Sequence, residues 1–348
     1  MESSSTSGRV EMPSEFEPRR LLRRALPVLA ALVVLTLVVV LAPGLDQVRQ
    51  RLSGARPGWL VLAVLLEFLS GASYVLMFRP IFSRRMSWRA SSEIAWSELA
   101  VSSLVPASGA GGLALGAWIL RQAGMPADQI ARRSVAFFLI KSSVNFIAVA
   151  VIGALMAVGL VGPHRSLWLT AVPAAASLLV IGGVLWAPRL GRGSDPAPGA
   201  GRLSKALAKT RDALIGGTAE AIEILRKRDP LVIIGAVGYW AFDNAVLWAT
   251  YHSFGHVPAL SIVLMGYLIG QLGGLLPLPG GVGGVDGGLI GTLVVYGAPA
   301  AVTTAAVFAY RLILFWLPLL VGGIAFVLLR RGLNNPQRPE LCSVPAAT

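Results

Sequence analysis

Apolar runs long enough to cross a lipid bilayer recur along this chain, and they constrain its fold more than any other feature. The runs over 25–42 and 148–161 are two of them, and hydrophobic residues make up 55% of the 348 residues. A helix needs about 20 apolar residues to cross the hydrocarbon. Charged residues make up only 14% of the chain, against about 25% in a soluble domain. The sequence therefore predicts an all-α polytopic membrane protein.

Hydropathy and length predict about six full transmembrane helices, near residues 25–43, 58–82, 134–161, 167–187, 230–253 and 303–329. Two further apolar stretches, 93–120 and 258–298, are interrupted by Gly and Pro. In the first, the pieces 94–105 and 109–120 contain 12 residues each, so each reaches only about 18 Å as a helix. Because such a piece cannot cross a bilayer alone, both stretches are predicted to form re-entrant hairpins.

The distribution of Lys and Arg supports this threading. If both broken stretches enter and leave on one face, 24 of the 30 basic residues lie on the side of the N-terminus and four on the other side. Such an excess is typical of cytoplasmic loops. Both chain ends are therefore predicted to be cytoplasmic, in the cell membrane of a bacterium. Residues 1–18 and 331–348 are expected to be tails, and 19–330 the membrane domain.

The loop over 188–229 carries nine of the basic residues, and its stretch from 203 to 228 alternates Leu and Ile with Lys and Arg. This pattern predicts a cytoplasmic helix that binds anionic lipid. Setting the topology is an equally supported role for the same charges. The net charge of +13 does not indicate nucleic acid, because the basic residues lie in short loops between apolar segments.

The two broken stretches correspond to each other in sequence. Gly109 to Gly112 match Gly281 to Gly284 at an offset of 172 residues, and Gly116 matches Gly288 at the same offset. Three full spans separate the stretches, so they are predicted to open to opposite faces as inverted repeats. Short half-helices that meet at the midplane in such repeats are typical of secondary transporters. Close helix packing is the alternative explanation for either glycine cluster alone.

Ionisable residues at membrane depth mark a candidate binding site, because a charge there costs at least about 2.5 kcal/mol. Lys141 and Arg311 each lie in the span that follows a broken stretch, and two cations at matching positions predict a clamp for an anionic group. The half-helix after each glycine cluster would direct its free N–H groups to the same anion. The predicted substrate-binding residues are Lys141, Arg311, Glu98, Gln271, Asp243, Asn244, Asp286, Gly109, Gly111, Gly112, Pro277, Pro279, Gly280, Gly281, Gly283 and Gly284.

Structural roles are the alternative for some of these charges. Asp243 or Asp286 is a candidate counterion of Arg311, and Glu67 has pairing with a neighbouring helix as its simplest role. We expect no enzyme activity, metal or cofactor. The single cysteine, Cys342, lies in a polar tail, and the three histidines lack the i,i+4 spacing of a helical zinc site.

Two runs of residues carry a family resemblance. They are Glu98 to Trp118 and Gly270 to Gly284, the latter followed by Gly297 to Pro299 and by Tyr310-Arg311. Over about residues 25–330 the chain resembles the lysylphosphatidylglycerol synthase transmembrane-region family, also called flippase-like domain proteins. In its relatives, the bacterial multiple peptide resistance factors, this domain moves aminoacylated phospholipid and is fused to an aminoacyltransferase. Because this sequence ends at Thr348, we expect no synthase activity.

The resemblance implies a carrier or flippase for a phosphate-bearing lipid, either a phospholipid or a polyprenyl-phosphate intermediate, in the cytoplasmic membrane. The expected partner is a lipid with an anionic head group. The alternative is a non-transporting membrane protein that scaffolds or regulates an envelope-biosynthesis enzyme. Association with such an enzyme or with further copies of the chain stays open.

Overall fold

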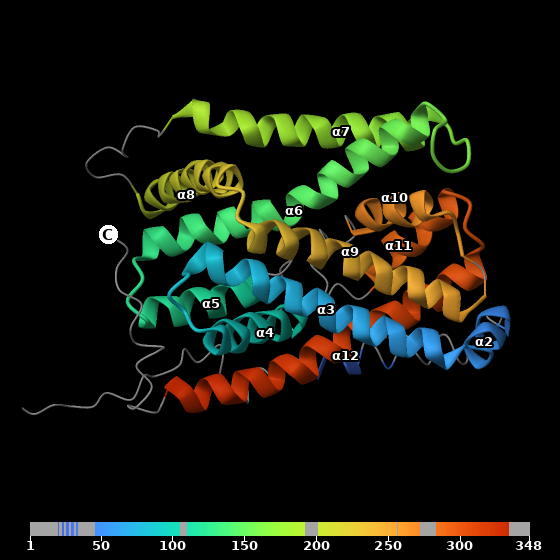
Figure 1. Cartoon of the computed structure of the whole chain (residues 1–348), viewed down its shortest axis with the longest axis horizontal. Helices are drawn as coiled ribbons and strands as arrows, with labels where there is room; N and C mark the ends of the chain where they lie inside the picture. Colours follow the sequence, from blue (N-terminus) through green and yellow to red (C-terminus); the bar gives the residue numbers. More distant parts are fainter. Residues whose placement is uncertain are drawn as a thin grey trace, which may run out of the picture.

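A computed structural model describes residues 46–104, 110–191, 201–255, 257–271 and 283–333, together with isolated residues between 20 and 33. In this described part the chain forms eleven α-helices (Figure 1). They are α2 (Asp46–Ser53), α3 (Pro57–Phe82), α4 (Trp88–Leu104), α5 (Ala110–Gln122), α6 (Ala127–Ala157), α7 (Leu167–Trp186), α8 (Arg202–Arg226), α9 (Pro230–Ser253), α10 (Leu260–Gln271), α11 (Gly284–Val295) and α12 (Ala300–Leu333), with a 3-10 turn, η2, over Ala187–Leu190.

Five of these helices, α3, α6, α7, α9 and α12, are long and apolar enough to cross a membrane. They agree with five of the six predicted spans, and the chain is a polytopic membrane protein. α6 begins seven residues earlier than predicted, because a short, mostly polar stretch continues the helix before the apolar run, and α12 begins three residues earlier. The predicted span over 25–43 falls mostly outside the described residues.

The ends of α9 show how local sequence fixes a span. Pro230 is the first helical residue, where its missing N–H costs no hydrogen bond. The side chain of Asp229 caps the helix by accepting the N–H of Leu231 at 3.0 Å. α9 then packs along α3, which is the most extensive contact between two helices in the described part of the chain.

The two Gly- and Pro-interrupted stretches form two pairs of short helices, α4 with α5 and α10 with α11. The four helices have 17, 13, 12 and 12 residues, and the helices of each pair pack on each other. Figure 1 shows the two pairs at opposite ends of the long axis of the bundle, and neither pair extends over its full length. The inverted relation between their sequences stays a prediction.

Glycines allow both pairs to pack closely. A Cβ atom on Gly116 of α5 would lie 1.5 Å from Oε1 of Glu98 in α4, and one on Gly288 of α11 would lie 2.4 Å from the carbonyl oxygen of Gly270 in α10. The two contacts join positions that correspond at the offset of 172 residues found in the sequence. Gly116 and Gly288 therefore allow close helix packing, and this role is independent of any ligand binding by the two interrupted stretches.

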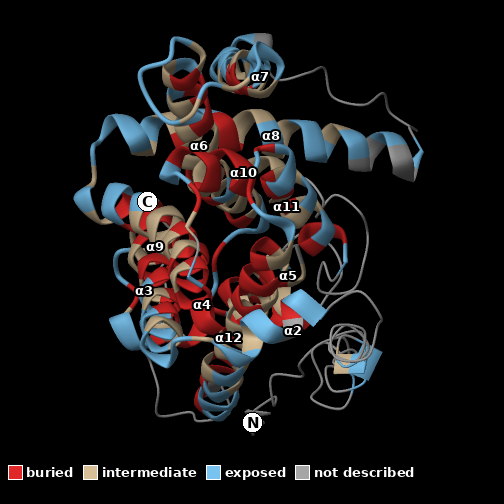
Figure 2. Cartoon of the chain, turned by 90° about the vertical axis from the view of Figure 1, so that its right-hand side faces the viewer, coloured by how far each residue is buried: buried red, intermediate tan, exposed pale blue. Residues whose placement is uncertain are grey.

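Two large buried clusters hold most of the apolar packing. One joins α4, α5 and α8 to the end of α3 and the start of α6, and the other joins α10 and α11 to the first half of α12 and the second half of α9. Figure 2 shows this buried interior, and shows α7 on the outside of the bundle. On α7, Trp168 and Leu179 are 79% and 76% exposed, as suits a surface in contact with lipid.

Candidate functional site

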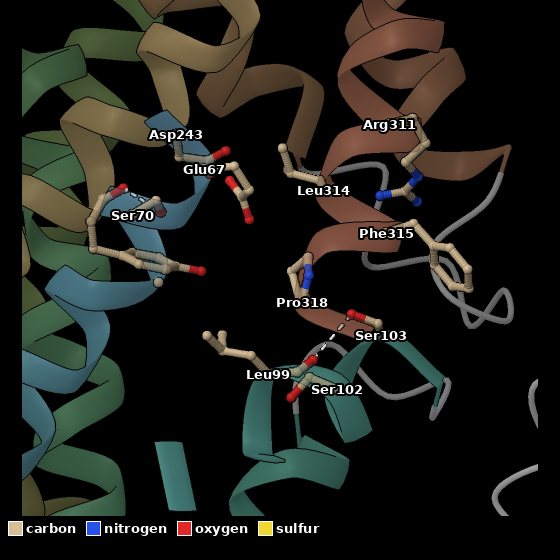
Figure 3. Close-up of a pocket in the computed structure, with 12 residues that line it drawn as sticks. Glu67, Ser70, Leu99, Ser102, Ser103, Asp243, Arg311, Leu314, Phe315 and Pro318 are labelled. Carbon is tan, nitrogen blue, oxygen red and sulfur yellow. Dashed lines mark hydrogen bonds between the residues drawn. The ribbon is translucent and has the colours of Figure 1, made fainter. Parts of the chain in front are cut away.

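Polar and charged side chains gather around a cavity of about 210 Å³ near the middle of the bundle (Figure 3). Helices α3, α4, α9 and α12 supply its walls. The lining residues are Glu67, Ser70, Gly71, Leu99, Ser102, Ser103, Tyr239, Asp243, Arg311, Leu314, Phe315 and Pro318. Three of these residues, Glu67, Asp243 and Arg311, are charged at neutral pH in water, and a charge buried in a membrane helix is costly.

Glu67 is the acid that α3 brings to the cavity. It is only 7% exposed, and its Oε2 has no hydrogen-bond partner among the residues that the structure describes. Its charge interacts with that of Asp243, and Figure 3 shows the two carboxylates side by side. The alternative role of Glu67, pairing with a neighbouring helix, stays a prediction, and its Oε2 makes no such hydrogen bond to the described residues.

Asp243 of α9 is held by two tyrosines. Its Oδ1 accepts the hydroxyl of Tyr310 at 2.9 Å, and its Oδ2 accepts the hydroxyl of Tyr267. These bonds fix the carboxylate between α9, α10 and α12. Beside it, Asn244 donates its Nδ2 to the carbonyl of Trp240 at 2.9 Å, which holds the side chain against its own helix.

Arg311 of α12 reaches the cavity and forms an ion pair with Asp286 of α11. Its Nε lies 3.1 Å from Oδ1 of Asp286, and both side chains are mostly buried. The other oxygen of Asp286, Oδ2, accepts the N–H of Gly283 at 2.9 Å and so caps α11. Of the two acids considered as counterion of Arg311, the structure therefore brings Asp286 into contact.

Glu98 and Lys141 form a second polar group beside the cavity. Glu98 is 1% exposed, and its Oε2 accepts the hydroxyl of Tyr74 at 2.9 Å. The Nζ of Lys141 lies 5.7 Å from the ring centroid of Tyr74 and 5.5 Å from that of Tyr239, within the range of cation–π attraction. Because Tyr239 also lines the cavity, it connects Lys141 to the site.

The structure thus brings together part of the predicted set. Arg311 and Asp243 line the cavity, Asp286 contacts Arg311, and Glu98 and Lys141 meet at Tyr74. Gln271 ends α10, and the described glycines Gly111, Gly112, Gly283 and Gly284 lie at the starts of α5 and α11. The predicted residues Gly109, Pro277, Pro279, Gly280 and Gly281 lie outside the described part of the chain.

The buried tyrosines and the position of Glu67 on the cavity did not emerge from the sequence. A signal was present, because Glu67, Ser70 and Tyr74 recur at helical spacing and share one face of α3. Tyr239 likewise precedes Asp243 by four residues on α9. Which helices these faces meet depends on the tertiary packing, and a pattern within one helix does not contain that information.

A second, larger cavity of about 920 Å³ lies where the end of α3, the start of α6, α8 and the start of α9 meet. Its charged lining residues are Arg84, Arg85, Arg132, Arg133, Lys227, Arg228, Glu220, Glu223 and Asp229. α8 is the helix predicted for the basic loop, and it packs against α6, where Glu220 binds Arg133 at 3.1 Å. The hydrogen bond and charge of Lys227 lower the pKa of Glu223.

Comparison with known proteins agrees with this architecture. Residues 28–322 match the family model described as the lysylphosphatidylglycerol synthase TM region. The chain is also similar to a UPF0104 membrane protein of Methanothermobacter thermautotrophicus, at 30% identity over 86 residues. That match spans 24% of this chain and 26% of the relative, so it covers about a quarter of each protein.

Proposed function

The chain belongs to the lysylphosphatidylglycerol synthase TM region family, and we propose that it carries a phosphate-bearing lipid across the cytoplasmic membrane of a bacterium. The observation that carries the proposal is Arg311, a guanidinium on a cavity lined by the short helix α4 and by α3, α9 and α12, which are long enough to span the bilayer. A guanidinium is always ionised and binds phosphate through two parallel hydrogen bonds. A buried Arg in a membrane helix is costly unless it is used.

In this proposal the head group exchanges places with Asp286. Asp286 holds Arg311 and the N-terminus of α11 when no lipid is bound, and a phosphate can bind the same two groups. Phe315 and Leu314 lie next to Arg311 on the cavity wall, so an apolar chain has a surface beside the head group. Lys141 is the second cation of the proposed site. It lies over the ring of Tyr239, which lines the cavity.

The placement of the two helix pairs supports transport rather than a purely structural role. The pairs lie at opposite ends of the bundle (Figure 1), and their closest glycine contacts correspond at one sequence offset. Carriers built from inverted repeats place the binding site between the repeats near the midplane. Glu98 and Asp286, two of the acids around the proposed site, come from one pair each.

Reconstitution tests the proposal. Purified protein is placed in vesicles that contain trace amounts of head-group-labelled phospholipid or labelled polyprenyl phosphate, and access of the label to a membrane-impermeant quencher is followed over time. We expect wild-type protein to accelerate movement of at least one of these lipids over empty vesicles. If every lipid in that panel moves at the same rate with the protein as in empty vesicles, the result favours the alternative, a non-transporting partner of an envelope-biosynthesis enzyme.

A further inference from the structure

The buried polar residues at the centre of the bundle carry more negative than positive charge. Among the described residues, four carboxylates lie there, Glu67, Glu98, Asp243 and Asp286, and each is at most 7% exposed. Lys141 and Arg311 are the two cations of the same group. Four carboxylates against two cations leave two negative charges, and since an uncompensated charge at this depth is costly, the group favours binding of further positive charge.

The contacts show where that charge is missing. Arg311 is bound to Asp286 at 3.1 Å, and the charge of Lys141 interacts with Glu98 and Asp243. Glu67 is left without such a partner in the part of the chain that the structure describes, and its Oε2 is buried and makes no hydrogen bond there. The side chain of Glu67 lines the cavity beside Asp243 (Figure 3).

Several oxygen atoms surround this position. Ser70 lines the cavity one helical turn after Glu67 and donates its hydroxyl to the carbonyl of Tyr239 at 3.2 Å. Pro318 has no N–H, so the carbonyl of Leu314 lacks the donor that a helix would supply, and both residues line the cavity. Oxygen atoms of carboxylates, hydroxyls and carbonyls are the ligands that hard cations prefer.

The geometry points to a binding site for one monovalent cation, either Na⁺ or a proton, between Glu67 and Asp243. One positive charge compensates the carboxylate that lacks a partner, and the cavity of about 210 Å³ beside it leaves room for the ion. The site extends the proposed lipid carrier by giving it an ion that can couple to transport. Binding of the ion itself requires no lipid.

The other ionisable groups around the pair restrict what can titrate or bind there. Tyr310 and Tyr267 donate to Asp243 from α12 and α10, and Tyr239 lies between the cavity and Lys141 on α6. Arg311 faces the cavity from α12, where it is bound to Asp286. Glu67 is therefore the carboxylate whose neutralisation breaks no contact among the described residues.

Thermal unfolding of the full-length protein in lipid-free detergent tests for Na⁺. We expect NaCl to raise the melting temperature over choline chloride at equal ionic strength, and Glu67→Gln to abolish this difference. Asp128→Asn, which removes an exposed carboxylate from the first turn of α6, is the matched control and should respond like wild type.

Infrared difference spectra between acidic and alkaline buffer test for the proton. A proton on the pair gives the carbonyl band of a carboxylic acid, and this band should be lost in Glu67→Gln and kept in Asp128→Asn. If Glu67→Gln does not fold, Glu67→Asp keeps the carboxyl group at a greater distance from Asp243. It should weaken the Na⁺ response at least tenfold or shift the pH midpoint of the band. Wild-type protein with neither a Na⁺ response nor this band overturns the site, whatever the lipid assay shows.

Discussion

The carboxylate of Asp286 lies 3.1 Å from Nε of Arg311 and joins the first turn of α11 to the middle of α12. Its second oxygen accepts the N–H of Gly283 at 2.9 Å. The guanidinium and the helix N-terminus are the two groups that the sequence suggests as anion ligands in this half of the molecule. In this structure both are occupied by a side chain of the protein, so an anionic head group must compete with Asp286.

Variants of Arg311 distinguish two roles of this residue: binding of the lipid head group and structural pairing with Asp286. Arg311→Gln should reduce lipid movement at least tenfold, because Gln keeps an N–H donor group but loses the charge and the two-point hydrogen bonding of the guanidinium. It should also lower stability by about 3 kcal/mol, because it leaves a buried carboxylate without its cation. The double variant Arg311→Gln/Asp286→Asn should recover stability in thermal unfolding but not lipid movement in vesicles.

The contrary result for that double variant is equally informative. If the neutral pair restores both stability and lipid movement, Arg311 serves only to compensate Asp286, and its assignment to the head group is wrong. Arg330→Gln, an exposed change near the end of α12, controls for the loss of one positive charge. It should leave stability and lipid movement unchanged.

Close packing of α10 and α11 is tested by two glycines of the same helix. Gly288→Ala places a Cβ 2.4 Å from the carbonyl oxygen of Gly270, whereas Gly291 has nothing within 4 Å of the corresponding position. We expect Gly288→Ala to destabilise the protein by about 1 to 3 kcal/mol through overpacking. Gly291→Ala should stabilise it by up to about 1 kcal/mol through helix propensity. Equal melting temperatures of the two variants would contradict the close contact.

The spans were predictable because a bilayer imposes a length on every apolar helix. The bounds of α3 and α9 differ from the predictions by a residue at most, since Pro57 and Pro230 mark their starts. The interrupted stretches were recognisable from Gly and Pro. α4 nevertheless starts at Trp88, ahead of the predicted stretch, because the polar residues before the apolar run also form helix.

The candidate site was less predictable, because it is formed between helices. Arg311 and Asp243 stood out as single charges in apolar spans, and the structure places both on the cavity. The pairing of Arg311 with Asp286, and the tyrosines around Asp243, depend on how α10, α11 and α12 pack. Hydropathy along one helix does not indicate which other helices it packs against.

If the two helix pairs open to opposite faces, as the sequence predicts, thiol labelling should differ between the two sides of the membrane. In a Cys342→Ser background, Ala127→Cys lies after the first pair and Ala300→Cys after the second, and both positions are exposed. A membrane-impermeant thiol reagent should label Ala300→Cys from outside intact cells and Ala127→Cys only after the membrane is opened. Labelling of both positions from the same side would contradict the inverted arrangement.

The basic cavity between α3, α6, α8 and α9 predicts binding of anionic lipid at the cytoplasmic surface. Arg85 and Arg228 line it and are exposed, and each basic residue near an anionic surface contributes about 1 kcal/mol. Replacing both with Gln should weaken binding of phosphatidylglycerol to the full-length protein in detergent about tenfold or more, as measured by native mass spectrometry. Replacing Arg330 and Arg331 with Gln removes the same charge from the end of α12, away from the cavity, and should change the affinity less. If both double variants lose affinity equally, the charges act only as a diffuse positive surface, and their main role is to set the topology.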